Sequence, residues 1–204
     1  KDPEVRAAAL ELVAQAEAYG GAYGINVAVG ALRDPEELVA TAALAALRRL
    51  WQRGDAEAIA TLAGLVTPGG RRAREPLLRA AALEAMQRLA ERGDGGALSA
   101  AGAALDDEDC SVRSTAVQTL KALCVRGDTE ASTLLLHYAD HRDSEVRRLV
   151  IEVLGYVAGA EDRQVISKLK ELQASDDVDT QVAAEQARRR RAALDLARLS
   201  AAAS

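Results

Sequence analysis

Two histidines carry the residue types from which a metal site could be built. His137 and His141 are four residues apart, so on one helix they would lie on the same side, close to Asp140 and Asp143. Imidazole nitrogens are common zinc ligands, but a zinc site takes three or four protein ligands. The sequence offers no evident third ligand, and the second histidine falls beside a turn. We predict no metal site here.

The two cysteines are too far apart to form a disulfide. Cys110 and Cys124 are 14 residues apart in what should be one helix, which separates them by about 21 Å, whereas bridged Cα atoms lie within about 7 Å of each other. We expect one near a helix start and the other in the core. No glycine-rich phosphate loop follows a strand and no other catalytic constellation is evident, so we predict no cofactor and no enzymatic activity.

The tripeptide Arg-Gly-Asp occurs three times, beginning at Arg53, Arg92 and Arg126. It is best known as a cell-adhesion signal, and an adhesion role predicts secretion and a loss of cell attachment when the aspartates become glutamate. The copies are 39 and 34 residues apart, however, which is the length of a structural repeat. What the tripeptide does therefore depends on the elements that surround it.

The composition is that of an all-helical protein. Of the 204 residues, 49% are hydrophobic but only 2% are aromatic, so most apolar side chains are Ala, Leu and Val, which suit closely packed helices. The net charge of −5 argues against a nucleic-acid-binding protein, which should carry a basic footprint. No apolar run approaches the roughly 20 residues of a membrane span. We expect an intracellular, cytoplasmic protein, with organelle targeting left open.

One sequence pattern recurs along the whole chain. The segment DPEVRAAAL (2–10) is similar to DSEVRRLVI (143–151) and DCSVRSTAV (109–117), and weaker copies are found near residues 36, 75 and 179. The intervals between copies are 34, 39, 34, 34 and 36 residues. Such a nearly constant period indicates a repeat architecture. Aligned on their first apolar residue, the copies are anchored at Val5, Val39, Leu78, Val112, Val146 and Val182.

The aligned columns describe a helix with one buried face. Three positions before each anchor is an acid that can cap a helix start. Apolar or small residues follow three, four, seven, eight and eleven positions after the anchor. Shorter apolar stretches from residues 57, 97, 131 and 163 each fit a second amphipathic helix, so the repeating unit is a helical hairpin. The six acids are Asp2, Glu36, Glu75, Asp109, Asp143 and Asp179.

This unit provides a structural position for the tripeptide, because each copy falls where one helix stops and the next begins. Arginine in a last helical turn would interact with the negative end of the helix, glycine would take a left-handed stop position, and aspartate would cap the following helix. The segment Thr67–Pro76 accounts for the longest interval, and we expect an exposed loop there, inserted between paired helices.

The pattern D-x-x-V-R-x-x-A, with an apolar helix before it, resembles the HEAT-repeat family, including the short HEAT-like repeats of bilin-lyase subunits. The resemblance implies an all-α, right-handed α-solenoid of stacked antiparallel helix pairs, with about five and a half repeats in one domain. The D-x-x-V-R helices would line its concave side. The units would span residues 1–18, 22–53, 55–92, 94–126, 128–159 and 161–204, so that the sequence begins within a repeat.

The same resemblance implies a ladder of ion pairs between successive repeats. It would join acids at the turns to the arginine that follows the anchor. The second and sixth units lack this arginine, so the ladder should be interrupted there. The residues assigned to the ladder are Asp2, Arg6, Arg79, Asp109, Arg113, Asp143 and Arg147.

The two ends of the array differ from its middle. Val5, Leu12 and Val13 of the first helix should form an uncovered edge, which further sequence or another chain would cover. The last unit carries Arg188–Arg191, which we interpret as the polar outer face of a terminal capping repeat. A groove for an acidic partner is the alternative interpretation, and the oligomeric state stays open.

Stacking of the units would create a long polar surface, because positions six, nine and ten after each anchor point away from the core. Arginine and aromatic side chains are frequent energetic anchors of interfaces. We therefore expect a non-catalytic scaffold or adaptor that binds a protein or extended peptide, or joins a larger assembly, through the concave face. A bilin-lyase-type enzyme subunit is the alternative, and Arg-Gly-Asp-mediated adhesion is a third hypothesis. The central contacts would be Glu84, Arg88, Gln118, Lys121, Glu152 and Tyr156.

Overall fold

The computed structural model describes residues 2–16, 21–67 and 76–202, and these residues form eleven α-helices and one 3-10 turn, with no strand among them. Residues 68–75 of the expected loop, including the predicted cap Glu75, lie outside the described residues. The elements are α1 (Pro3–Gln15), α2 (Gly21–Ala31), α3 (Glu37–Leu50), α4 (Ala56–Val66), α5 (Pro76–Leu89), α6 (Gly95–Ala103), η1 (Ala104–Asp106), α7 (Cys110–Leu123), α8 (Thr129–Tyr138), α9 (Ser144–Val157), α10 (Arg163–Leu172) and α11 (Val178–Ala202).

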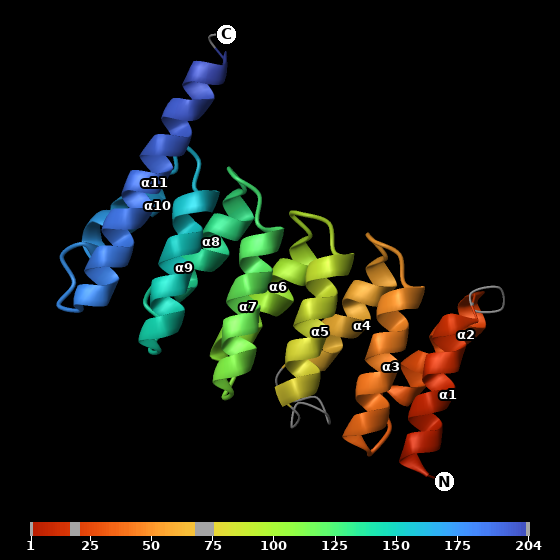
Figure 1. Cartoon of the computed structure of the whole chain (residues 1–204). Helices are drawn as coiled ribbons and strands as arrows, with labels where there is room; N and C mark the ends of the chain where they lie inside the picture. The colour runs from red at the N-terminus through yellow and green to blue at the C-terminus, as the bar shows by residue number, and fades with distance from the viewer. Residues whose placement is uncertain (1, 17–20, 68–75, 203–204) are drawn as a thin grey trace.

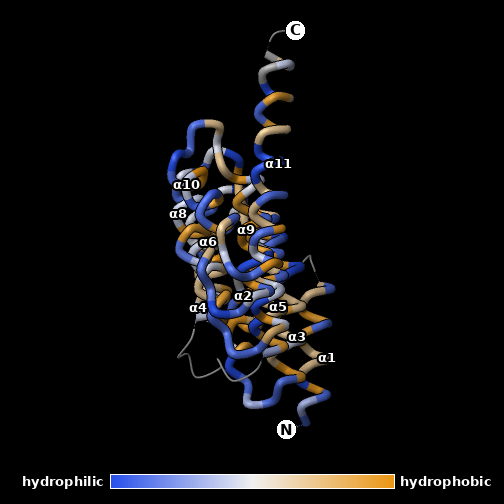
Figure 2. Tube along the Cα trace, turned by 90° about the vertical axis from the view of Figure 1, so that its left-hand side faces the viewer, coloured by the Kyte–Doolittle hydropathy of each residue, from blue (hydrophilic) through white to orange (hydrophobic). Residues whose placement is uncertain are grey.

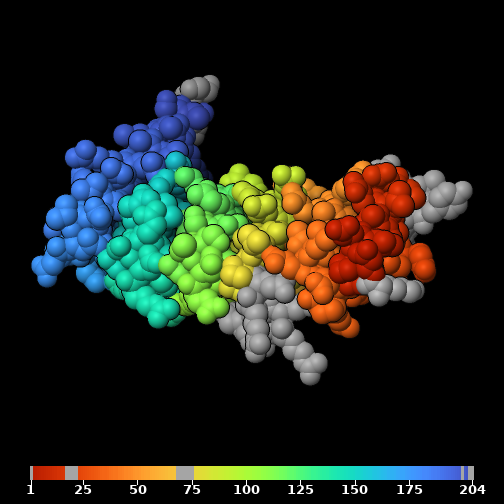
Figure 3. Space-filling view, turned by 60° about the horizontal axis from the view of Figure 1, so that its bottom comes forward, coloured from red at the N-terminus to blue at the C-terminus, as the bar shows by residue number. Residues whose placement is uncertain are grey.

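The helices stack in two layers, which confirms the predicted all-α solenoid. The odd-numbered helices lie side by side in one layer and the even-numbered helices in the other (Figure 1). The side view separates these layers and shows the end of α11 extending beyond them (Figure 2). The units follow one another in chain order along the long axis of the molecule (Figure 3). Within the described ranges, no helix is long and apolar enough to cross a membrane.

A continuous apolar core fills the space between the layers, from Leu10 to Ala187. The anchors of the four central units, which include Val39 and Val146, are buried as the period predicts. The anchors of the end units are not, since Val5 is 65% exposed and Val182 is 50% exposed. A helix that begins or ends the described stack is covered on one side only, so its buried face narrows.

In helix α11, a different set of residues is buried from the set that the repeat period predicts. Its buried residues are Thr180, Ala183, Ala184 and Ala187, rather than the predicted anchor Val182. The buried residues of α11 are small because α11 lies very close to α9. A Cβ atom added to Gly155 of α9 would lie 2.7 Å from the Cα atom of Ala187, so glycine is required at this crossing.

The three Arg-Gly-Asp tripeptides form the turns between units. Gly54, Gly93 and Gly127 have φ angles of 81°, 84° and 84°, in the left-handed region that glycine tolerates best. Their N–H groups donate to the carbonyl oxygens of Leu89, Leu123 and Val157, at 2.7, 2.8 and 2.7 Å, in the next odd-numbered helix. The aspartates cap α4, α6 and α8 with their side chains, as predicted.

The predicted place of the arginine is wrong, because α3, α5 and α7 each end three residues before it. The arginine lies in the turn and reaches the neighbouring unit instead. Arg92 donates to the carbonyl oxygen of Cys124 at 2.8 Å, and Arg126 donates to that of Tyr156 at 3.0 Å. Each therefore supplies positive charge to the carboxyl end of the next odd-numbered helix rather than to its own.

Candidate binding surface

Four arginines connect successive units through aspartates. The most buried pair is Arg79 with Asp107, in which the arginine Nε and Nη2 atoms donate to both carboxylate oxygens at 2.7 Å. These side chains are 2% and 6% exposed. A bidentate arginine–carboxylate pair is both strong and geometrically specific. The equivalent pairs, at 2.8, 2.6 and 2.6 Å, are Arg6–Asp34, Arg113–Asp143 and Arg147–Asp177.

The acid partners differ from those that the sequence suggested. Asp2 and Asp109 cap their own helices, by accepting from Glu4 and from Ser111 and Val112, and the arginines reach other aspartates. Glu36 occupies a cap position but makes no cap hydrogen bond with its side chain. Asp179 lies inside the first turn of α11 rather than before it. Asp143 both caps α9 and accepts from Arg113 of the preceding unit.

The aspartates that pair with the arginines, but that the sequence analysis did not assign to the ladder, share a position two residues before the predicted cap. There, the side chain accepts the N–H of the residue two positions later, which prepares the turn into the helix. The distances are 3.1, 2.9, 3.0 and 3.2 Å for Asp34, Asp107, His141 and Asp177. The sequence contains a pattern that marks this position: D-x-E or D-x-D begins five residues before three of the anchors.

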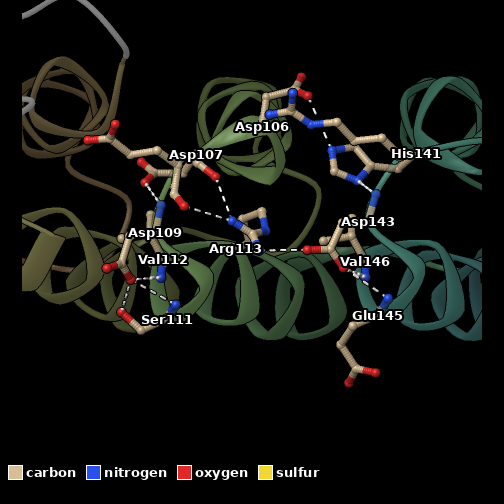
Figure 4. A network of polar contacts seen from close by, with 12 residues as sticks. Asp106, Asp107, Asp109, Ser111, Val112, Arg113, His141, Asp143, Glu145 and Val146 are labelled. Carbon is tan, nitrogen blue, oxygen red and sulfur yellow. Dashed lines mark hydrogen bonds and ion pairs between the residues drawn. The ribbon is translucent and has the colours of Figure 1, made fainter.

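His141 replaces the aspartate at this position in one unit, and the network adjusts around it (Figure 4). Its Nδ1 accepts from the N–H of Asp143 at 3.0 Å, and its Nε2 lies 3.2 Å from Asp106. Arg113 therefore pairs with Asp143 and also donates to the carbonyl oxygen of Asp107. Both ring nitrogens of His141 are engaged in the fold, and the described residues contain no group of three potential metal ligands.

The units that lack the arginine carry small buried residues instead. Ala40 in α3 and Ala183 in α11 stand at this position, and both are buried. The cysteines lie as expected, with Cys110 exposed at the start of α7 and Cys124 buried at its end, both as free thiols. Burial raises the pKa of the Cys124 thiol to about 12.

The outward side of the odd-numbered layer carries the six predicted contact residues. We call it the odd-helix face and define it by the predicted residues of α5, α7 and α9 together with Arg48, Arg49 and Arg190. Lys121 of α7 donates to Glu152 of α9 at 2.9 Å, and Arg190 of α11 lies 3.5 Å from the same Glu152 oxygen. The hydrogen bond from Lys121 lowers the pKa of Glu152 below its usual range.

Both cations of this cluster, Lys121 and Arg190, lie close to the ring of Tyr156. The Nζ atom of Lys121 is 5.6 Å from its ring centroid and the guanidinium carbon of Arg190 is 4.3 Å away, and both are within reach of a cation–π interaction. The ring is nevertheless 39% exposed. A groove of about 170 Å³ adjoins the cluster between α9 and α11, lined in part by Arg148, Glu152 and Gln186.

The structure brings Lys121, Glu152 and Tyr156 together, and it adds Arg190, which the sequence interpretation placed in a terminal cap. Glu84, Arg88 and Gln118 are exposed on α5 and α7 and form no ion pair within the described residues. Other arginines of the 188–191 run form contacts within the last unit or with the turn before it. Arg189 pairs with Glu185, and Arg191 donates to the carbonyl oxygen of Ala160 at 2.9 Å.

Comparisons with known proteins agree with this architecture. Residues 98–189 match the family model of HEAT repeats. A designed armadillo repeat protein in complex with the peptide (KR)4 is similar in structure, with 19% identity, a TM-score of 0.55 and coverage of 90% of this chain and 92% of that one. An engineered protein is similar with 19% identity, a TM-score of 0.54 and coverage of 95% and 92%. No curated protein sequence matches the chain.

A second designed armadillo repeat protein gives 20% identity, a TM-score of 0.51 and coverage of 91% of this chain and 92% of that one. At these identities the solved structures establish the fold alone. The match to HEAT repeats covers two of the arginine–aspartate junctions, Arg113–Asp143 and Arg147–Asp177. The same arrangement recurs outside the match at Arg6 and Asp34. Residues 98–189 are therefore similar to HEAT repeats, and the chain forms an α-solenoid of stacked helical hairpins.

Proposed function

We propose that this chain is a non-catalytic scaffold whose odd-helix face holds an extended peptide segment of a protein partner. The observation that supports it is the cluster of Lys121, Glu152, Tyr156 and Arg190, contributed by three successive odd-numbered helices. An exposed aromatic ring framed by cations is a typical energetic anchor of an interface.

The shape of the molecule also favours a long ligand. Stacked units present equivalent side chains at regular intervals along the layer, so a peptide can contact several helices in succession. One structurally similar protein, a designed armadillo repeat protein, is in complex with a peptide. The tripeptides are already used within the fold, since their glycines and aspartates form the turns and caps between units.

The proposal can be tested with a display library of random twelve-residue peptides. The wild-type chain should enrich a set of related sequences, and the double variant Arg88→Ala/Tyr156→Ala should lose about tenfold of that enrichment. Gln164→Ala/Lys170→Ala, which changes exposed residues of α10 in the other layer, serves as the matched control. All three proteins should give the same helical circular dichroism. Equal enrichment by the wild type and the odd-helix variant would contradict the proposal.

A further inference from the structure

The odd-helix face carries five cations and two acids, Glu84 and Glu152, although the protein as a whole is acidic. The last turns of successive odd-numbered helices carry Arg48 and Arg49 in α3, Arg88 in α5 and Lys121 in α7. Arg190 of α11 continues this series through its contact with Tyr156. We call these five residues the basic row. The net charge of the chain is −5, so the acidic excess must lie elsewhere.

The acids are concentrated at the turns, where the fold uses them. Asp55, Asp94 and Asp128 accept backbone N–H groups at the starts of α4, α6 and α8. Asp34, Asp107 and Asp177 accept from arginines of neighbouring units. The negative charge is thereby engaged in caps and junctions. Arg48, Arg49 and Arg88, by contrast, form no ion pair within the described part of the chain.

We infer that the ligand of the odd-helix face is an acidic peptide segment, bound in extended form with its carboxylates on the basic row. This inference rests on the proposed function and adds the chemical class of the ligand. Neighbouring packed helices lie about 8–10 Å apart, and an extended chain rises about 3.3 Å per residue. One carboxylate in every third residue would therefore match the spacing of the cations.

Glu152 already occupies the position that one ligand carboxylate would take. Its Oε1 atom accepts from Lys121 at 2.9 Å and lies 3.5 Å from Arg190, so it neutralises two members of the basic row. A ligand carboxylate must compete with this internal acid. Replacing Glu152 with an uncharged isostere should consequently strengthen the binding of an acidic peptide, an effect that a purely structural role would not produce.

A peptide is favoured over a single-stranded nucleic acid, which would also carry negative charge. Proteins that bind single strands combine a basic groove with several aromatic side chains on which successive bases stack. On the odd-helix face, Tyr156 is the one aromatic side chain among the described residues, and two cations already lie close to its ring. The acidic net charge of the chain also argues against a nucleic acid as the ligand.

The test is fluorescence polarisation at low salt with labelled peptides of defined spacing. The wild-type chain should bind (Glu-Ser-Gly)4 at least about tenfold more tightly than (Lys-Ser-Gly)4, and more tightly than an isomer with its four glutamates in one block. Arg49→Glu/Arg88→Glu should weaken binding about tenfold, since two cations of the basic row become carboxylates that repel the ligand. Glu152→Gln should strengthen it about threefold. Arg163→Glu/Lys170→Glu on α10 changes the net charge equally and should have little effect.

Several results would overturn the inference. These are equal affinity for the acidic and basic peptides, equal weakening by the α10 variant, no gain from Glu152→Gln, or tighter binding of an octadeoxythymidylate of comparable charge. Failure here is separable from failure of the proposed function. If the peptide library yields sequences that depend on Arg88 and Tyr156 but carry no acidic residues, the binding face stands and only its assigned ligand class is wrong.

Discussion

At the scale of single residues, the junctions between units depend on aspartates that serve the helix start and the neighbouring repeat together. Asp107 accepts the N–H of Asp109 at 2.9 Å and both donors of the buried Arg79. Where His141 occupies the equivalent position, the arginine of the preceding unit moves to Asp143. The residue two positions before the helix cap, aspartate or histidine, thus determines which aspartate pairs with the arginine of the preceding unit.

Asp107→Ala should lower the free energy of unfolding by about 3–5 kcal/mol, because it removes the carboxylate of a buried bidentate ion pair with Arg79. Urea denaturation followed by circular dichroism measures the change. Glu108→Ala is the control, since this adjacent side chain is exposed, and its effect should stay within about 0.5 kcal/mol. A loss below about 1 kcal/mol for Asp107→Ala would show that the pair is not essential to the junction.

At the scale of elements, the turn between units combines a left-handed glycine with a hydrogen bond to the next odd-numbered helix. Gly127 has a φ of 84° and donates to the carbonyl oxygen of Val157 at 2.7 Å. The arginine before it caps the carboxyl end of that same helix. The recurrence of the tripeptide follows from this geometry, which occurs at three successive boundaries between units.

Gly127→Ala and Gly64→Ala should change stability in opposite directions. A Cβ atom would meet nothing within 4 Å at either position, so only backbone conformation differs. Alanine at the left-handed Gly127 should cost about 1 kcal/mol. In the interior of α4, alanine at the exposed Gly64 should add about 0.5–1 kcal/mol. Paired denaturation curves provide the measurement, and a shift of the two midpoints in the same direction would refute this explanation.

At the scale of the whole molecule, the basic row lies on the odd-helix face, whereas many of the aspartates lie at the turns between helices. Three of the carboxylates at the turns have a pKa below the usual range of aspartate. The hydroxyl of Ser111 lowers the pKa of Asp109, the N–H of Val146 lowers that of Asp143, and the hydroxyl of Thr180 lowers that of Asp177. Stability should therefore depend on pH through the turns that contain these three aspartates.

The free energy of unfolding should fall on acidification. An aspartate with a folded-state pKa below its unfolded value of about 3.9 stabilises the fold fully above that pH, and this contribution disappears as the pH falls through the lower folded value. Denaturation at pH 6, 4 and 3 should show the loss below about pH 4. Asp143→Asn should flatten the profile. A stability that stays constant between pH 6 and 3 would contradict the role assigned to these carboxylates.

Most of the architecture follows from the sequence alone, because it arises from interactions within a few residues. The period of the anchors, the buried face of each helix, the left-handed glycines and the aspartate caps are all set locally, and the structure confirms them in the central units. The D-x-E and D-x-D pattern before Val39, Val112 and Val182 is local as well, and it would have identified the aspartates that accept from the arginines.

Tertiary structure alone decided what depends on how one unit rotates and packs against the next. The contact of Gly155 with Ala187 turns α11 so that Val182 is exposed, and the same packing brings Arg190 onto Tyr156 and Glu152. No local pattern contains that rotation. It results from the fit of side chains between helices, so a residue predicted for the terminal cap became part of the candidate binding surface.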